Sequence, residues 1–274
     1  FIVGLLNTLL VAGLGISIAT VVGFAVGIAR LSSNWLVARL AESYIEILRN
    51  IPLLLQIFFW YFAVLRALPK PKQSLELADS FFLNNRGLYL PDPVFGEGGV
   101  VILYSFIAAI LISIGIAIWS KQRQNKTGQT FPVFYSSVGL VLSFFFLSML
   151  ATGFPLTFEY PELKGFNFKG GIKLIPELVA LTFALSMYTA SFIAEVVRAG
   201  IQAVSLGQTE AARSLGLNSN QILRLVIIPQ ALRVIVPPLT NQYLNLTKNS
   251  SLAAAIAYPD LVLVFAGTAL MQTG

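Results

Sequence analysis

Cysteine and histidine are both absent from the 274 residues of this chain, and charged residues are scarce, at 11% of the sequence. Without cysteine and histidine there are no disulfides, thiolate nucleophiles, Cys/His zinc sites or imidazole acid-base groups. The charged fraction is far below the roughly 25% of soluble globular domains. These deficits exclude the commonest catalytic and metal-binding devices, and they exclude an ordinary soluble domain.

Hydrophobic residues take the place of the missing polar ones, at 56% of the sequence with a mean hydropathy of +0.79. Uncharged runs cover residues 1–29, 98–120 and 127–158, and each exceeds the roughly 20 apolar residues that a helix needs to cross a bilayer. We therefore predict an all-α, polytopic helical membrane protein, with residues 1–274 forming a single transmembrane domain. Spans are expected near residues 2–29, 43–65, 99–119, 134–152, 176–197 and 222–247.

Glycine and proline predict how two of these spans are built. The first span carries glycines that permit close helix approach, namely Gly13, Gly15, Gly23 and Gly27. In the sixth span Pro237 and Pro238 are expected to interrupt the helix and free its carbonyl groups.

The two ends of the sequence predict a piece of a longer protein. The chain begins with Phe1 instead of methionine and stops at Gly274 without a polar tail, so we expect incomplete termini. The first apolar run has no basic segment before it and is too long for a signal peptide.

Basic residues mark three short loops that fall on one side of the membrane by span counting. They are Arg30 to Arg39, Lys121 to Lys126, and the surroundings of Arg198, Arg213 and Arg224. Short loops rich in Lys and Arg face the cytoplasm. The loop at 66–97, with four basic and four acidic residues, is accordingly predicted to be periplasmic.

A short polar helix is predicted at about residues 206–215. Ser205 with Gln208 has the spacing of a capping box, and Gly216 stands where a helix would end in a left-handed cap. Asn218 with Gln221 then signals a new helix start. Ten residues are too few to cross a bilayer, and spacing alone would equally suit an ordinary interfacial helix.

The residues of this helix carry a family resemblance. The family pattern begins with Glu-Ala-Ala and has Gly after three further residues. Nine residues later it has an aliphatic-rich run that ends in Pro. This chain matches the pattern at Glu210, Ala211, Ala212, Gly216, Val226, Ile228 and Pro229. The pattern resembles the cytoplasmic loop of permease subunits of binding-protein-dependent ABC importers. The runs at 46–56, 195–201, 229–233, 241–242 and 246–252 look like the polar and general amino-acid permeases.

The resemblance covers residues 1–66 and 176 to about 265, and it implies a type I importer transmembrane domain. Residues 99–152 would be an inserted helical hairpin, which resembles the larger members of the family. Residues 205–217 would be the cytoplasmic coupling helix, with the ATPase contacts made by Glu210, Ala211, Ala212, Arg213 and Gly216.

The implied partners are two ATPase subunits, a second permease subunit that is identical or homologous, a periplasmic amino-acid-binding protein and membrane lipid, with no nucleic acid. The sequence has no Gly-x-x-x-x-Gly-Lys-Ser/Thr phosphate loop, so ATP and Mg would be bound by the partner ATPase, and this chain would need no cofactor and no metal. The expected location is a bacterial inner membrane.

Polar side chains inside the spans are the candidates for a substrate path, because they are costly in hydrocarbon unless they are used. The candidates are Gln56, Tyr61, Tyr188, Thr189, Ser191, Asn241, Gln242, Asn245, Lys248, Asn249 and Ser250. Lys248 would suit a substrate carboxylate, although snorkelling to the surface competes with that role. Any of the others could instead hydrogen-bond between helices or pack as an aromatic.

Two pairs of opposite charge are predicted to be structural ion pairs at the cytoplasmic rim, Glu46 with Arg49 and Glu195 with Arg198; one of them could instead touch the ATPase. A secondary transporter remains the alternative function. An intramembrane enzyme is disfavoured, because no paired carboxylates or Ser-Lys spacing stands out.

Overall fold

The computed structural model describes residues 1–96, 98–154 and 156–273, and its contacts divide the chain into two units. The first unit comprises residues 1–76, 82–88 and 173–274, and the second comprises 77–81 and 89–172. Glu97, the predicted end of the 66–97 loop, and Gly274 lie outside the described residues.

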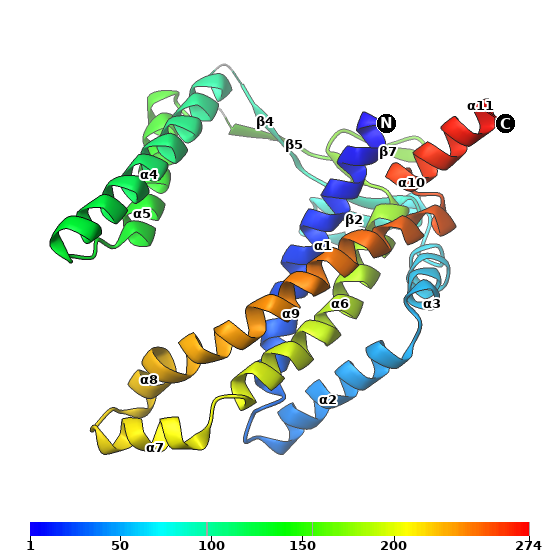
Figure 1. The fold of residues 1–274 in the computed structure, drawn as a ribbon. Coiled ribbons are helices and arrows are strands. Elements are labelled where there is room, and N and C mark those ends of the chain that lie inside the picture. The colour runs from blue at the N-terminus through cyan, green and yellow to red at the C-terminus, as the bar shows by residue number, and fades with distance from the viewer. Residues whose placement is uncertain (97, 155, 274) are drawn as a thin grey trace. The chain divides into compact units, whose positions relative to one another are not determined.

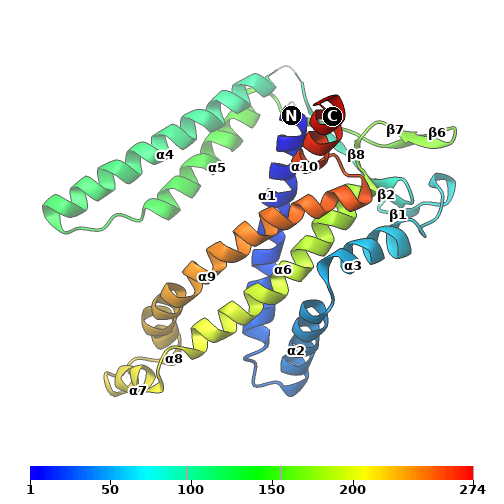
Figure 2. The ribbon, with the colours of Figure 1, turned by 45° about the vertical axis from the view of Figure 1, so that its right-hand side comes forward.

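Three long helices form the centre of the first unit. They are α1 (Ile2–Ala29), α6 (Pro176–Gln202) and α9 (Ile228–Asn249), and they run side by side in both ribbon views (Figure 1, Figure 2). Helix α6 is the most buried of the three, with Leu181, Leu185 and Ile193 fully inside. The small residues that alternate with these side chains allow the other two helices to pack closely against α6.

Glycines make the contacts between these helices possible. A Cβ at Gly23 would lie 2.6 Å from the Cβ of Ile193, and one at Gly27 would lie 2.7 Å from the carbonyl oxygen of Ala194. Both distances are below van der Waals contact, so only glycine fits there. The predicted close approach is confirmed for these two positions, whereas Gly13 faces open space.

The second predicted span is a sharply bent pair of helices, not one helix. Helix α2 (Trp35–Asn50) is followed by α3 (Leu53–Phe58) and a π-helical turn (Phe59–Leu65), and the two parts meet at 103°. Ile51 precedes Pro52 and is extended, with φ −92° and ψ 124°, because a residue before proline avoids the helical region. The prediction of a continuous helix over 43–65 is therefore wrong, although the two parts together are still long and apolar enough to be one broken span.

Pro237 and Pro238 do not break the helix that contains them. Helix α9 continues through both prolines from Ile228 to Asn249. Proline costs the helix backbone donors but fixes φ in the helical range, and membrane helices tolerate it. The predicted interruption is wrong.

The remaining elements of this unit are short. The coupling region holds α7 (Leu206–Ser214), α8 (Ser219–Ile222) and a π-helical turn (Leu223–Ile227). After α9 come a 3-10 helix (Ser250–Ile256), α10 (Leu261–Val264), a π-helical turn (Phe265–Leu270) and α11 (Met271–Thr273). Asn7 donates to the carbonyl of Pro259 across 2.9 Å, so this last segment is tied to the start of α1.

The second unit contains the helices of the predicted 99–152 hairpin, α4 (Gly99–Thr127) and α5 (Val133–Ala151), which pack against each other. Helix α4 runs two turns beyond its predicted end and includes the basic residues Lys121 to Lys126. Most of the side chains of both helices are exposed and apolar, as expected of helices that lie in lipid.

The 66–97 loop and the segment between α5 and α6 contain short strands that were not predicted from the sequence. They are β1 (Leu75–Leu77), β2 (Phe81–Asn84), β3 (Gly87–Leu90), β4 (Asp92–Phe95), β5 (Leu156–Glu159), β6 (Glu162–Lys164), β7 (Asn167–Lys169) and β8 (Ile172–Leu174). One sheet has the order β1-β2-β3-β8, and two antiparallel pairs join β4 to β5 and β6 to β7. A short 3-10 helix (Pro71–Gln73) precedes these strands.

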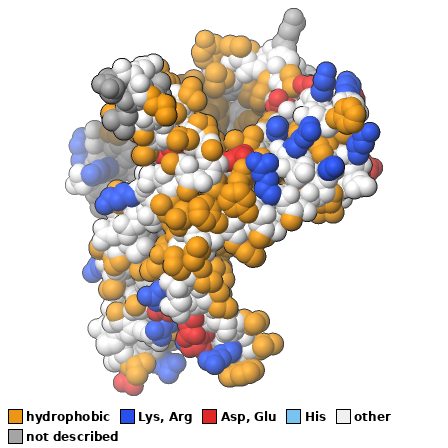
Figure 3. All heavy atoms as spheres, turned by 90° about the vertical axis from the view of Figure 1, so that its right-hand side faces the viewer, with side chains coloured by type: hydrophobic (Ala, Val, Ile, Leu, Met, Phe, Trp, Pro, Cys, Tyr) orange, Lys and Arg blue, Asp and Glu red, His pale blue; other side chains and the backbone are white. Residues whose placement is uncertain are grey.

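Length and composition make five described helices candidate membrane spans, namely Ile2–Ala29, Gly99–Thr127, Val133–Ala151, Pro176–Gln202 and the continuous stretch Ser219–Ile256, with the bent pair as a sixth. Figure 3 shows charged side chains of both signs at the lower end of one face and hydrophobic side chains above them. The all-α polytopic membrane fold is confirmed, since the strands lie only in the loops between spans.

Candidate coupling and substrate sites

Helix α7 is held at its C-terminus by a glycine cap. Gly216 has φ +78°, its N–H donates to the carbonyl of Arg213 at 2.9 Å, and the N–H of Leu217 donates to the carbonyl of Ala212 at 3.2 Å. These paired bonds satisfy the last carbonyl groups of the helix, and they require the left-handed conformation that glycine adopts without strain. The predicted left-handed end is confirmed.

The start of α8 is also as predicted. Asn218 accepts a hydrogen bond from the N–H of Gln221 at 2.9 Å, and Gln221 accepts one from the N–H of Asn218 at 3.0 Å. This reciprocal box fixes the direction in which the chain leaves the short helix. The Gly216 cap and this box therefore give the connection from α7 to the following helix a defined backbone geometry.

The predicted capping box at Ser205 does not form. Ser205 is the N-cap residue, but its side chain caps nothing, and the side-chain oxygen of Gln208 accepts instead from Gln230 Nε2 on α9, at 3.3 Å. The side chain of Gln208, which the local spacing predicts in a capping box, is therefore bonded to a residue far away in the sequence. The consequence is a direct link between α7 and α9.

The outer surface of α7 is uncovered. Of its residues only Ala212 is buried, whereas Glu210, Ala211 and Arg213 are exposed. Leu206 is 80% exposed and Leu215, just past the helix, 81%. Single exposed leucines are common on protein surfaces, so these two add no evidence of their own for a partner. The exposure of these two leucines was not predicted from the sequence, although both stand at the ends of a polar segment.

Basic residues gather at the same end of the unit as α7. Arg30 pairs with Glu42, Arg39 pairs with Glu42 at 2.7 Å, and Arg198 pairs with Glu195 at 3.4 Å. Figure 1 shows that the end of α1, the start of α2 and the end of α6 lie near α7. This is the end for which the positive-inside rule predicts a cytoplasmic location.

Of the two predicted ion pairs, Glu195 with Arg198 is confirmed and Glu46 with Arg49 is wrong. The Arg49 guanidinium lies over the ring of Phe192, with its carbon 5.1 Å from the ring centroid. A cation over an aromatic face is favourable, and here it draws Arg49 away from the carboxylate one turn earlier.

The candidate path residues on α9 share one face. Asn241, Asn245 and Lys248 are all exposed, at the i, i+4 and i+7 spacing that aligns side chains along a helix. Gln242 and Asn249 are half-buried, and Ser250 is buried and donates to the carbonyl of Thr247 at 2.7 Å. A polar stripe on the outside of a membrane helix is costly in lipid, so it indicates a surface that faces water or another subunit.

The other candidates are engaged within the unit. On α6, Thr189 and Ser191 are buried, Ser191 donates to the carbonyl of Tyr188 at 2.6 Å, and the Tyr188 ring packs on Phe192 with centroids 4.9 Å apart. These contacts match the packing role that the sequence analysis held open. The structure thus separates the α6 candidates from the stripe on α9.

Gln56 and Tyr61 each stabilise a particular piece of structure. Gln56 Nε2 donates to the carbonyls of Leu48, at 2.8 Å, and Ile51, at 2.9 Å, and so satisfies the end of α2 at the bend. The Tyr61 hydroxyl donates to Glu177 Oε1 at 2.7 Å and accepts from Arg66 at 2.6 Å. This hydrogen bond raises the pKa of Arg66, so its guanidinium stays charged. In the part of the chain that is described, no three acidic side chains gather as metal ligands would.

Comparisons with known proteins identify the family of this chain. Residues 109–273 match the family described as "Binding-protein-dependent transport system inner membrane component". The chain is 58% identical, over its whole length and 70% of the relative's, to the putative amino-acid ABC transporter permease protein YhdX of Escherichia coli K12. It is 53% identical to the general L-amino acid transport system permease protein AapQ of Rhizobium johnstonii, over its whole length and 68% of the relative's.

A more distant relative and a solved structure extend the comparison. The glutamate/glutamine/aspartate/asparagine transport system permease protein BztB of Rhodobacter capsulatus is 45% identical, over 90% of this chain and 65% of that protein. The crystal structure of an amino acid ABC transporter with histidines shares the fold, with a TM-score of 0.54 and 22% identity over 98% of this chain and 79% of the solved chain.

The chain therefore belongs to the binding-protein-dependent transport system inner membrane components: it is a multi-pass transport subunit of the inner membrane, not an enzyme, and it works with an ATPase and a periplasmic binding protein.

Proposed function

We propose that this chain is the permease subunit of an ATP-driven system for the uptake of amino acids. Three relatives with 45% to 58% identity are named as permeases for amino acids or for sets of them. The runs at 46–56 and 229–233, which look like those of amino-acid permeases, support the same cargo class.

The observation that carries the proposal is the exposed helix α7 with its defined C-terminal connection. Its C-terminus is closed by the Gly216 cap, the Asn218–Gln221 box starts the next helix directly after it, and its outer face presents Glu210, Ala211 and Arg213 to solvent. We place this face in a groove of the partner ATPase, which binds ATP and Mg. A displacement of this helix would reach α9 through the Gln208–Gln230 hydrogen bond and through the capped connection at its C-terminus.

The polar stripe of α9 would line the translocation path. Asn241 and Asn245 offer both donors and acceptors, and Lys248 offers a cation for a substrate carboxylate. Because this stripe is on the outside of a single chain, the path needs a second surface, which we assign to a second permease subunit, identical or homologous. Two ATPase subunits and a periplasmic amino-acid-binding protein would complete the assembly.

Transport would follow from a change between two states of this assembly. ATP binding would draw the ATPase subunits together, displace α7 and turn the path from inward-facing to outward-facing. The permease changes conformation but performs no chemistry on its cargo.

Uptake by the reconstituted assembly tests this function. Vesicles that contain the permease with its ATPase should accumulate labelled L-amino acids when the binding protein is outside and ATP is inside. A non-hydrolysable ATP analogue should abolish accumulation. Uptake that continues without ATP would overturn the proposal in favour of a secondary carrier.

A further inference from the structure

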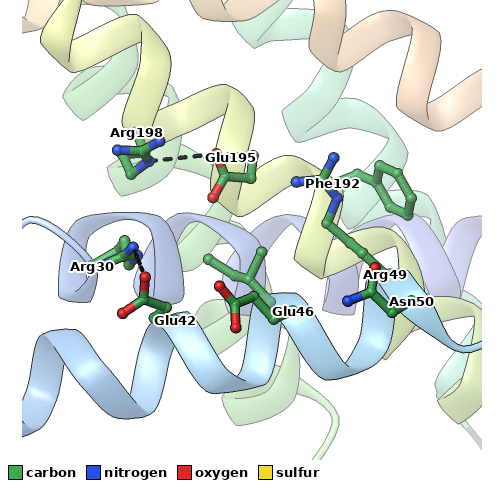
Figure 4. Close-up of a pocket in the computed structure, with 9 residues that line it drawn as sticks. Arg30, Glu42, Glu46, Arg49, Asn50, Phe192, Glu195 and Arg198 are labelled. Carbon is green, nitrogen blue, oxygen red and sulfur yellow. Dashed lines mark hydrogen bonds and ion pairs between the residues drawn. The ribbon is translucent and has the colours of Figure 1, made fainter.

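A pocket of about 440 Å³ lies between α2, the end of α1 and α6, in the same unit as the coupling helix. Figure 4 shows charged side chains of both signs around it. Its lining includes three arginines and three glutamates, namely Arg30, Arg49, Arg198, Glu42, Glu46 and Glu195. The formal charges balance, so the pocket as a whole favours neither an anion nor a cation.

Most of these charges are already paired within the protein. Glu42 binds Arg30 and also Arg39, and Glu195 binds Arg198. Among the described residues Glu46 and Arg49 form no ion pair, and both are on the pocket side of α2. One carboxylate and one guanidinium therefore remain for a ligand.

The position of Arg49 explains why these two groups do not neutralise each other. They are three residues apart, a spacing at which an ion pair commonly forms on a helix. The guanidinium instead lies over the Phe192 ring, 5.1 Å from its centroid. Phe192 thus holds Arg49 as one wall of the pocket and supplies an apolar surface beside it.

One ligand chemistry fits this set. A free α-amino acid carries a carboxylate, which a guanidinium binds with two hydrogen bonds, and an ammonium group, which a carboxylate binds. The remaining side chain of the ligand would lie along Phe192. The volume is at the small end of the range of about 300–1,000 Å³ that small-molecule pockets cover.

We propose that this pocket is a second amino-acid site, open to the cytoplasm, through which imported amino acid slows further uptake. The inference rests on the proposed function, since it takes the same cargo class. Helices α2 and α6 already touch through the Tyr44 hydroxyl, which donates to the carbonyl of Met187 at 2.9 Å. A ligand held by Glu46 and Arg49 on α2, against Phe192 on α6, braces the two helices and resists their relative movement.

The test compares uptake by vesicles with empty and with loaded interiors. The complete transporter is reconstituted with ATP inside and the binding protein outside, and the L-amino acid taken up fastest from a labelled panel is identified. The same amino acid, unlabelled, is then enclosed at increasing concentration. We expect the initial rate to fall in the wild type, and Glu46→Gln or Arg49→Gln to raise the half-inhibitory internal concentration about tenfold, as the loss of a charge-assisted hydrogen bond predicts.

Two kinds of control give the result its meaning. Glu162→Gln and Lys121→Gln remove one exposed charge of each sign outside the pocket and should leave the inhibition curve unchanged. Enclosing the decarboxylated amine or the deaminated acid in place of the amino acid should not inhibit the wild type, because each lacks one of the two charged groups.

Each contrary result leads to a different conclusion about the second site and the proposed function. Uptake that is insensitive to internal amino acid overturns the second site and leaves the proposed function standing. The same holds if Glu46→Gln lowers uptake equally in empty and loaded vesicles, which would make the pocket a contact for the ATPase. Failure of every amino acid in the panel to be taken up overturns the proposed function, and the second site with it.

Discussion

The side-chain amide of Gln230, on α9, donates to the side-chain oxygen of Gln208, on α7, across 3.3 Å. The two residues are 22 positions apart, and their bond joins the exposed polar helix to the long helix that carries the polar stripe. A direct bond between these elements is what a displacement of α7 would use to reach α9.

We expect Gln230→Ala to weaken the coupling of ATP hydrolysis to uptake. A neutral hydrogen bond contributes about 0.5–1.5 kcal/mol, so the number of ATP molecules hydrolysed per amino acid transported should rise a few-fold without loss of folded protein. Gln122→Ala, an exposed glutamine on α4, is the control. An unchanged ratio of hydrolysis to uptake would show that the bond has no part in coupling.

Gly216 allows a test of the cap by conformation alone. Because its φ is +78°, Gly216→Val should strain the end of α7 by at least about 1 kcal/mol and lower uptake strongly, while ATP hydrolysis continues. Gly216→Asn should retain most of the uptake, since asparagine tolerates the left-handed region better than other residues. Equal activity of the two variants would mean that the cap geometry does not matter.

The contact between α1 and α6 predicts a selective loss of stability. Gly23→Leu would force a side chain into Ile193, because a Cβ at residue 23 would lie only 2.6 Å from the Cβ of Ile193, and the variant should have a lower unfolding temperature in detergent. Overpacking of this kind costs about 1–3 kcal/mol or more. A Cβ at residue 13 meets nothing within 4 Å, so Gly13→Leu should unfold like the wild type. Equal losses in both variants would contradict the assigned packing.

Gln56 can be assigned to structure or to the substrate path by one pair of measurements. Gln56→Leu removes the two hydrogen bonds to the carbonyls of Leu48 and Ile51, at about 0.5–1.5 kcal/mol for each bond. We expect a lower unfolding temperature and an unchanged KM for uptake by the protein that remains folded. A changed KM at wild-type stability would place Gln56 in the path instead.

The polar stripe on α9 predicts which variants should change the affinity or selectivity for amino acids. Lys248→Ala and Asn245→Ala should each raise the KM for amino-acid uptake about tenfold or change the order of preference among amino acids, because each removes a polar group from the path. Arg224→Ala, an exposed cation outside the stripe, should leave the order of preference unchanged. If both stripe variants transport like the wild type, the stripe is a contact between subunits.

Local chemistry was enough for several parts of the fold. The first span ends at Ala29 as predicted, because the apolar run ends there, and α7 lies within one residue of its predicted bounds. The Gly216 cap and the Asn218–Gln221 box also formed as expected, since each depends on residues within a few positions of each other. The family pattern around Glu210 lies in this same locally determined region.

Other features of the fold depend on contacts between residues far apart in the sequence, which replaced the predicted local contacts. Gln208 binds Gln230 instead of capping α7, and Arg49 stacks on Phe192 instead of pairing with Glu46. The helix stays intact at Pro237, and it is Pro52 that marks a bend, where Gln56 is at hand to satisfy the freed carbonyls. Spacing along the chain cannot rank these partners against one another.

The sequence by itself therefore determined that this protein lies in a membrane and that it carries a short polar helix between two spans, because composition and short-range motifs fix those properties. Only the tertiary structure decided which polar groups are used up by the fold and which remain open. That balance depends on contacts between helices far apart in sequence, and within the described residues it leaves the polar groups of the α9 stripe exposed and Glu46 and Arg49 without an ion-pair partner.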